Sequence, residues 1–480
     1  MIDPAIAKKV NIFCLLIAIV VVLVLPLKKE IWYDESISIL ISKGINNDSK
    51  TLFANSTTIS SATIEQLNTL PNVYKASVID NGNSFLYNVC LHWFTGLFGN
   101  SIPVYMLLSK LSSIAALLAF FVLCRLFLKD SIFTSVAIVF LATDLNFIGM
   151  SHEIRAYAMG AFFITLAVVY LYRYLWENEK PLYLFFIGLF SVAAILCHFL
   201  SVYAVLVFLA YLVFVKKAKL LSLNNLIAIM IPVLLIATYF YFSFVGLKYM
   251  SNQNEAIAHK AAMEPFTLLH VVYRSMAMVA IDFKVVFASF TAKKTVGIAS
   301  FLLVIVMYMM ALKNANDKTE KRNLHLLFIL GVAGSFFLAL LCFKSHHYTA
   351  MYNRYHSFCI PFACLFTAYV LYVLFKKPGV NMAIKGGVLA ITLLPCCALF
   401  VLFLRTSNPP LRYNHIALAK EITTDKVAKI EVPDWNDAFL IQSFLPQGYK
   451  IDYVLNKSSL YFTLYKANST EQVLIISNNF

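Results

Sequence analysis

Long apolar runs alternate with short polar segments along the whole chain. About eleven of these runs are roughly 20 residues long, the length that a helix rising about 1.5 Å per residue needs to cross a ~30 Å hydrocarbon core. Backbone groups in lipid must be hydrogen-bonded within their own segment, so each run is predicted to be a helix. The predicted spans cover residues 10–27, 103–127, 131–149, 156–175, 182–200, 202–215, 223–246, 295–312, 324–343, 356–375 and 386–404.

Lysines and arginines between the spans predict how the chain is oriented. Lys8 and Lys9 precede the first span, a lysine cluster at 216–219 follows the sixth, and basic residues at 313–322 follow the eighth. With eleven spans all of these groups fall on one side, which is the cytoplasm by the positive-inside rule. We therefore expect a multi-pass protein of the cytoplasmic (inner) membrane, with its N-terminus in the cytoplasm and its C-terminus on the periplasmic or extracellular side.

The stretch 266–290 is apolar enough to compete as a twelfth span. It contains His270, Arg274, Asp282 and Lys284, and an ionised residue at mid-membrane costs ~2.5–3.5 kcal/mol. A crossing here would also move the basic loop at 313–322 to the outside. We expect this stretch to be a helix lying at the outer interface.

The polar regions divide the chain into two predicted domains. Residues 1–404 form a transmembrane domain with external loops at 28–102 and 247–294, and residues 405–480 form an external tail after Pro409-Pro410. The tail is predicted to be a small α/β domain. Its expected strands are 429–432, 451–455, 461–465 and 472–476, and its expected helix is 434–444. The fold class is therefore an α-helical polytopic membrane protein with external interfacial helices and a small C-terminal α/β domain.

Composition agrees with a membrane protein. Hydrophobic residues make up 60% of the chain and charged residues only 13%, against roughly 25% charged residues in soluble domains. The net charge of +15 does not indicate nucleic-acid binding, because the basic residues are spread over short loops between apolar runs. Membrane lipid is the partner that this charge pattern predicts.

The first cluster with possible chemistry is Trp32-Tyr33-Asp34-Glu35, a few residues after the first span. Two adjacent acids at a membrane surface are disfavoured by lipid phosphates and need an explanation. Either Asp34 caps the start of an interfacial helix, or it is a base that accepts the proton of an acceptor hydroxyl beside the hydrocarbon. The sequence leaves both alternatives open.

The second cluster is 151–157, which lies in a very short outer loop between two spans. It contains His152, Glu153 and Arg155, followed by Tyr157. Arg155 either anchors the loop among lipid headgroups or binds a phosphate through its forked guanidinium group. Three ionisable residues in so tight a turn favour phosphate binding.

Further basic and aromatic residues lie at the outer ends of later spans. His198 stands alone at one outer turn, where a histidine is more often structural than catalytic. His346 and His347 precede Arg354 and Tyr355, a combination that suits an anionic ligand and a stacking surface. Adjacent histidines could bind zinc, but no cysteine or second histidine pair stands at ligand spacing. We expect no metal and no other cofactor.

These motifs together resemble the C-type integral-membrane glycosyltransferases. Within that family they are most similar to the bacterial branch that includes the lipid A aminoarabinose transferase and the protein O-mannosyltransferases. The resemblance covers roughly residues 10–405, with order and topology both matching. It rests on Trp32-Tyr33-Asp34-Glu35, Asn83-Ser84-Phe85-Leu86-Tyr87, Leu97-Phe98-Gly99, Glu153-Ile154-Arg155-Ala156-Tyr157, His198-Phe199 and Arg354-Tyr355 ahead of Pro361.

The resemblance implies an inverting transfer of a sugar from a polyprenyl phosphate carrier to a lipid, glycan or protein acceptor. By position, Asp34 would be the base with Glu35 beside it, and Arg155 and Arg354 would bind the donor phosphate. The chain departs from the family at Asn83-Ser84, where a proline pair is common, and at Lys110, where an arginine is common. The residues expected to contact substrate are His152, Glu153, Tyr157, His198, His346, His347 and Tyr355.

Two other functions compete with a transferase. A transporter or flippase of lipid-linked substrates predicts charges and broken helices near mid-membrane, whereas the predicted spans hold few ionised residues. A structural assembly factor would leave Asp34 and Arg155 without a shared role. The transferase predicts that Asp34, Arg155 and Arg354 surround one cavity.

Overall fold

The structure is a computed structural model that divides into two compact units. One unit consists of Met1–Leu27, Lys110–Ser151 and Tyr157–Ser407, and the other of Lys28–Ser109, His152–Ala156 and Asn408–Phe480. We call them the helical unit and the mixed unit. The residues that the structure describes are 3–24, 33–46, 49, 53, 56–80, 83–129, 131–216, 220–243, 302, 305–334, 356–376, 415–432, 434–446, 448–456, 461–466 and 472–477.

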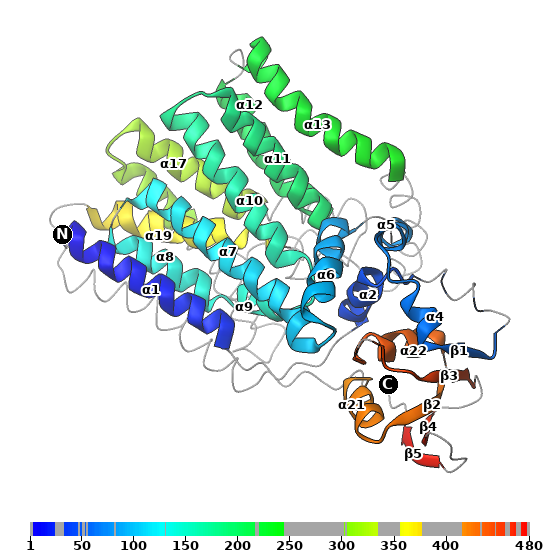
Figure 1. Cartoon of the computed structure of the whole chain (residues 1–480). Coiled ribbons are helices and arrows are strands. Elements are labelled where there is room, and N and C mark those ends of the chain that lie inside the picture. Colours follow the sequence, from blue (N-terminus) through cyan, green and yellow to red (C-terminus); the bar gives the residue numbers. More distant parts are fainter. Residues whose placement is uncertain are drawn as a thin grey trace. The chain divides into compact units, whose positions relative to one another are not determined.

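The helical unit is built from long apolar helices (Figure 1). Over the described residues, five helices are long and apolar enough to cross a membrane, namely Pro4–Val24, Ile102–Leu128, Tyr157–Glu177, Phe199–Lys216 and Leu223–Tyr241. The chain is therefore a multi-pass membrane protein. The helices are α1 (Pro4–Val24), α7 (Ile102–Leu128, which starts in the mixed unit), α8 (Ile132–Thr143), α9 (Leu145–His152), α10 (Tyr157–Tyr172), η1 (Arg173–Glu177), α11 (Pro181–Cys197), α12 (Ser201–Lys216), α13 (Leu223–Ser243), α17 (Lys318–Phe328), η4 (Ile329–Ala333) and α19 (Ile360–Lys376).

The predicted spans are found as helices wherever the structure describes them, with one difference. The span expected as a single helix over 131–149 consists of α8 and a second helix, Asn146–His152, that is bent from it by 59°. Asp144 stands at the break, where its Oδ1 accepts a hydrogen bond of 2.8 Å from the Phe147 N–H and so caps α9. The expected span 386–404 and the stretch 266–290 lie outside the described residues.

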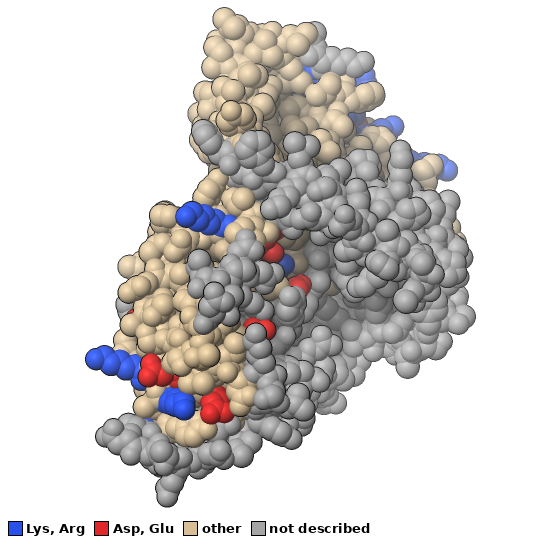
Figure 2. Space-filling model, turned by 90° about the vertical axis from the view of Figure 1, so that its right-hand side faces the viewer, with Lys and Arg blue, Asp and Glu red and all other residues tan. Residues whose placement is uncertain are grey.

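Small and polar side chains bring the helices of this unit close together, as is common in membranes. Asn11 of α1 donates to the Ser131 carbonyl at 3.1 Å and accepts from Ser135 Oγ at 2.6 Å, which ties α1 to the start of α8. At Gly331 of η4 an added Cβ would lie 2.7 Å from the Ala363 backbone nitrogen of α19. Figure 2 shows that most of the described surface on one face is neither acidic nor basic.

The mixed unit combines short helices of the first loop with a five-stranded sheet. Its sheet has the order β1-β3-β2-β4-β5; β2 and β3 are parallel, and the other neighbours are antiparallel. The elements are α2 (Tyr33–Ser42), β1 (Thr58–Ser60), α4 (Ser61–Glu65), α5 (Leu70–Ile79), α6 (Phe85–Phe98), α21 (His415–Thr424), β2 (Val427–Val432), α22 (Trp435–Gln442), β3 (Asp452–Leu455), β4 (Tyr461–Lys466) and β5 (Gln472–Ser477).

The four strands and the helix that the sequence predicts in the tail are present within a residue or two of their expected bounds. In β2 the apolar residues Val427, Ile430 and Val432 are buried, and the step of three from Val427 to Ile430 coincides with a register shift between Val427 and Lys429. The sheet is not made by the tail alone, however. Strand β1 comes from the first loop, and the Leu455 N–H donates to the Thr57 carbonyl at 2.9 Å. The first loop and the tail therefore share one hydrophobic core.

Candidate active site

The candidate site is built on α2, the first helix after the initial span. Asp34 and Glu35 lie in its first turn, where carboxylates are stabilised by the unpaired N–H groups and the helix dipole. The two acids nevertheless differ in their surroundings. Asp34 is half-buried, whereas Glu35 is 1% exposed. Only one member of the pair is therefore accessible to a substrate.

Glu35 holds the 152–156 segment against α2. Its Oε1 accepts a hydrogen bond of 2.7 Å from the Ile154 N–H, although the two residues are 119 positions apart. A buried carboxylate that accepts a backbone N–H makes a charge-assisted bond, which is shorter and stronger than a neutral one. Glu35 therefore positions the segment that carries Arg155.

Arg155, the residue after Ile154, is also hydrogen-bonded to α2. Its Nη1 donates to the Asp34 carbonyl oxygen at 2.9 Å and to Ser38 Oγ at 3.1 Å. The Ser38 hydroxyl in turn donates to the same Asp34 carbonyl at 3.3 Å. Arg155 is 9% exposed, so a full positive charge is buried beside the half-buried Asp34. The structure thus brings together the acid motif and the arginine that the sequence predicts to act together.

A further acid belongs to this group of residues. Asp80 follows the C-terminus of α5, and burial raises its pKa to about 6, while Arg155 lowers that pKa and Asp34 raises it. An acid with a pKa near neutral in such surroundings is typical of functional sites. We call Asp34, Glu35, Ser38, Asp80 and Arg155 the Asp34–Arg155 cluster.

Two buried residues, Ser84 before α6 and Asn88 within it, carry polar groups that form no hydrogen bond within the described residues, and α6 packs against α2 and α5. Asn88 is 1% exposed, yet neither its Oδ1 nor its Nδ2 is hydrogen-bonded within the described part of the chain. The same holds for the buried hydroxyl of Ser84, which begins α6 in a left-handed conformation with φ of 62°. A buried polar group left without a partner costs ~1–3 kcal/mol. Such groups are suited to bind the hydroxyl groups of a ligand.

The other predicted site residues are placed as follows. His152 is buried, and Glu153 is half-buried with an Oε2 that forms no hydrogen bond within the described residues. In the helical unit, the rings of Tyr157 and His198 lie 5.1 Å apart, and His198 also contacts the Phe358 ring at 5.8 Å. Four predicted residues lie outside the described part of the chain: His346, His347, Arg354 and Tyr355.

Among the described residues, no group of three or more His, Cys, Asp or Glu side chains is arranged to hold a metal ion. The adjacent histidines His346 and His347 lie outside the described residues. Absence of a metal therefore stays a prediction for the chain as a whole.

Sequence reasoning missed Asp80 and Asn88 as parts of the site. Asp80 stands shortly before Asn83-Ser84 and belongs to no motif, and Asn88 occurs in a run of apolar and aromatic residues that predicts helix. An amide flanked by apolar residues on α6 was the available signal, because a helix that lies on other helices buries such a side chain. Asp80 interacts with Asp34 and Arg155 through the packing of α5 and α2, and Asn88 lies on α6, which packs against both helices.

No protein-family model and no curated protein matches the chain. Eight chains of solved structures are similar to it, among them the following two. One is the oligosaccharyltransferase of Archaeoglobus fulgidus in complex with zinc and sulfate, with 12% identity, a TM-score of 0.45, and coverage of 92% of this chain and 58% of that enzyme. The other is ArnT from Cupriavidus metallidurans in the apo state, with 12% identity, a TM-score of 0.39, and coverage of 91% and 84%.

Both similar proteins are C-type glycosyltransferases, the family that the sequence motifs resemble, and ArnT is the lipid A aminoarabinose transferase. The chain spans little more than half the length of the archaeal enzyme, 58%. Because both TM-scores are below 0.5, we base the function on the residues of the Asp34–Arg155 cluster and not on these structures.

Proposed function

We propose that the protein is an inverting glycosyltransferase that moves a sugar from a polyprenyl phosphate carrier to an acceptor hydroxyl at the outer face of the membrane. One observation carries the proposal: the Arg155 guanidinium donates to the Asp34 carbonyl at 2.9 Å, so an accessible acid and a buried cation share one site. A carboxylate base and a phosphate-binding cation are the groups that such a transfer requires.

The proposed reaction is a single displacement. The acceptor oxygen attacks the anomeric carbon of the donor sugar, and its proton passes to the Asp34 carboxylate. The bond between that carbon and the phosphate oxygen breaks, and the polyprenyl phosphate leaves with the electron pair. Arg155, together with Arg354, is proposed to stabilise the negative charge on the leaving phosphate. Glu35 positions the Arg155 segment through its bond to the Ile154 N–H.

The remaining polar groups are proposed to bind the two substrates. Asn88 and Ser84 have buried groups that no described residue satisfies, and Glu153 has a carboxylate oxygen of the same kind. His152, Tyr157, His198, His346, His347 and Tyr355 remain proposed substrate contacts. The acceptor is a lipid, glycan or protein of the cell envelope. The chain is proposed to lie in the inner membrane, with its N-terminus in the cytoplasm and its C-terminus outside.

The decisive experiment compares Asp34→Asn with Glu35→Gln in the purified protein, using a panel of polyprenyl phosphate sugars as donors. Asp34→Asn keeps the shape of the side chain but cannot accept a proton, so transfer should be abolished while donor binding is retained. Glu35→Gln should keep part of the activity, because its amide oxygen can still accept the Ile154 N–H. Activity of Asp34→Asn within a few-fold of wild type would remove Asp34 from the base role.

Transport of a lipid-linked substrate is the second candidate, and the break between α8 and α9 at Asp144 favours it, since transporters bind substrates at broken helices. Reconstitution in vesicles separates the two functions. A flippase moves the donor across the bilayer without an acceptor and leaves the donor intact. A transferase releases polyprenyl phosphate only when an acceptor is present.

A further inference from the structure

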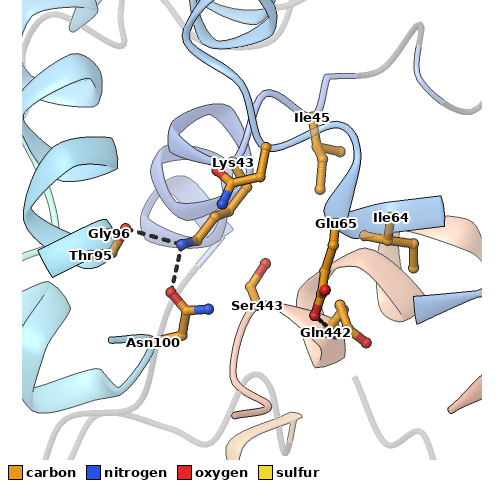
Figure 3. A pocket seen from close by; sticks show the side chains of 10 residues that line it. Lys43, Ile45, Ile64, Glu65, Thr95, Gly96, Asn100, Gln442 and Ser443 are labelled. Carbon is orange, nitrogen blue, oxygen red and sulfur yellow. Dashed lines mark hydrogen bonds between the residues drawn. The ribbon is translucent and has the colours of Figure 1, made fainter. Parts of the chain in front are cut away.

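A cavity of about 300 Å³ lies within the mixed unit, where the end of α2 meets α4, the end of α6 and the end of α22 (Figure 3). We call it the Lys43 cavity. No residue of the Asp34–Arg155 cluster lines it. Ligand pockets commonly have volumes of roughly 300–1,000 Å³, so the cavity suits a small ligand. Most of the side chains that line it are polar, which makes a hydrophobic ligand unsuitable.

Lys43 brings a buried positive charge to one wall. It is 6% exposed, and its Nζ donates to Thr95 Oγ1 at 3.0 Å and to Asn100 Oδ1 at 2.6 Å. Both acceptors are neutral, and no carboxylate among the described residues forms an ion pair with Lys43. Burial lowers the pKa of Lys43 to about 8. An ammonium group has three hydrogens, so one remains for an acceptor in the cavity.

The opposite wall presents a carboxylate and an amide, as Figure 3 shows. Glu65 Oε1 accepts hydrogen bonds from Gln442 Nε2 at 3.3 Å and from the Gly448 N–H at 3.1 Å. Its second oxygen forms no hydrogen bond within the described residues and can accept from a ligand hydroxyl. The cavity therefore has a cation on one side and hydroxyl-binding groups on the other.

A purely structural role explains Lys43 less well. A lysine just after the C-terminus of α2 is favoured by the helix dipole, and this one also joins α2 to α6. These benefits do not require a cavity beside the charge. The Lys43 ammonium has two neutral acceptors and lies 5.9 Å from the Tyr105 ring centroid, but burial of an ammonium without an anionic partner is still costly. An anionic group in the cavity would remove that cost.

We propose that the Lys43 cavity binds a saccharide unit that carries one carboxylate or phosphate group. The anion pairs with Lys43 and accepts its third hydrogen. Hydroxyl groups of the sugar donate to Glu65 and accept from the Gln442 and Asn100 amides. The volume excludes a long glycan, so the ligand is a single unit or the end of a chain. This binding is independent of glycosyl transfer, because it needs neither Asp34 nor Arg155.

Binding to the full-length protein in nanodiscs of neutral phosphatidylcholine tests the proposal. Calorimetry with glucuronate and glucose 1-phosphate should give affinities roughly tenfold or more above those for glucose and inorganic phosphate. Nanodiscs that contain a glucuronosyl diacylglycerol, compared with free glucuronate, decide between a lipid headgroup and a free saccharide as the source. A wild-type protein that binds glucose as tightly as glucuronate would overturn the proposal.

Variants separate ligand binding from a structural role. Lys43→Met should abolish binding without lowering the melting temperature, because it removes a buried unpaired charge. Gly96→Leu keeps the charge and fills the cavity, since a Cβ at Gly96 meets no atom within 4 Å, and it should also abolish binding. Lys75→Met, at an exposed position on α5, is the matched control and should bind normally.

Two outcomes would contradict the proposal. If Lys43→Met melts well below wild type and no anionic saccharide binds the wild-type protein, Lys43 is structural. If Gly96→Leu binds as well as wild type, the ligand is not in this cavity. Asp34→Asn should bind anionic saccharides normally. Binding of anionic saccharides by Asp34→Asn therefore tests the Lys43 cavity alone, whereas sugar transfer by the same variant tests the proposed reaction alone.

Discussion

The carboxyl groups of Asp34 and Glu35 lie in different surroundings, because Asp34 is half-buried and Glu35 is buried. Both acids stand in the first turn of α2, so the helix dipole favours a carboxylate at either position. Glu35 becomes the positioning residue because its carboxylate accepts the N–H of Ile154, 119 residues away.

At the same scale, Asp80 predicts how stability depends on pH. Its pKa of about 6 in the folded protein is above the ordinary value of 3.8, so the folded state binds this proton more tightly than the unfolded state. Ionisation of Asp80 therefore lowers stability as pH rises through that window. We expect Asp80→Asn to melt like wild type near about pH 4 and at a higher temperature than wild type above about pH 7.

Thermal unfolding in detergent over this pH range measures the difference between variant and wild type. Asp452→Asn, at an exposed position on β3, is the control for removing one surface carboxyl group. A constant difference between Asp80→Asn and wild type at every pH would show that the Asp80 carboxyl is not perturbed by folding.

Asn88 predicts a trade-off between stability and activity. Its buried amide has no partner among the described residues, so replacement by an apolar side chain of similar size should relieve a cost of ~1–3 kcal/mol. Asn88→Leu should therefore raise the melting temperature and lower sugar transfer. In the control Asn72→Leu, the Leu67 carbonyl loses the amide that donates to it at 3.0 Å, so stability should fall. Full activity in Asn88→Leu would exclude a substrate contact.

Helices and strands whose local sequence encodes their conformation are the easiest to predict. The tail strands can be predicted from short runs rich in β-branched and aromatic residues, and the long helices from their apolar length. Strand β1 was missed, because Thr58–Ser60 is three residues long and mostly polar. Only its pairing with β3 makes it a strand, and no local pattern encodes that pairing.

The break between α8 and α9 is a second feature that the sequence does not predict, because apolar residues continue on both sides of it. A bent helix pair either crosses the membrane or returns to the side from which it entered. The Ile154 N–H after α9 bonds to Glu35, which precedes α7, so both residues lie on the same side. If α7 crosses once, the α8–α9 pair must cross as well. In that case the pair is a broken span.

The close packing of η4 against α19 predicts that one added methyl group at Gly331 lowers stability. At Gly331 an added Cβ would lie 2.7 to 2.9 Å from backbone atoms of Phe362 and Ala363, which cannot rotate away. Gly331→Ala should therefore destabilise the protein by ~1–3 kcal/mol. In Gly149→Ala the Cβ meets no atom within 4 Å, so this α9 variant should be neutral or slightly stabilised. Melting temperatures in detergent compare the two, and equal values would contradict the contact between η4 and α19.

At the scale of the whole molecule, the sheet restricts the topology. Strand β1 lies between the first span and α7, whereas β3 belongs to the tail, and the two strands are hydrogen-bonded. Strands of one sheet cannot lie on opposite sides of a bilayer. The number of crossings between residues 60 and 427 is therefore even, as the ten spans predicted between them require.

A cross-link tests this arrangement. Thr58 faces Val454 across the β1–β3 pair, and residues directly opposite have Cβ atoms about 4.5–5.5 Å apart. Thr58→Cys with Val454→Cys should form a disulfide on mild oxidation in membranes, detected by mass spectrometry. Thr58→Cys with Asp452→Cys, offset by two residues, should cross-link much less. Equal cross-linking of the two pairs, or none in either, would exclude the β1–β3 register.

The pairing of β1 with β3 also has a consequence for biosynthesis. The Ser61 hydroxyl accepts the N–H of Ile451, which is 390 residues later in the chain. At roughly 5–20 residues per second, a ribosome needs about 20–80 s to make the intervening chain. During that time the first loop is without its partner strand, and its apolar residues Ile59 and Ile64 lack the core they will join. A nascent chain arrested before residue 452 should consequently expose the first loop to added protease, and release of the finished chain should protect it.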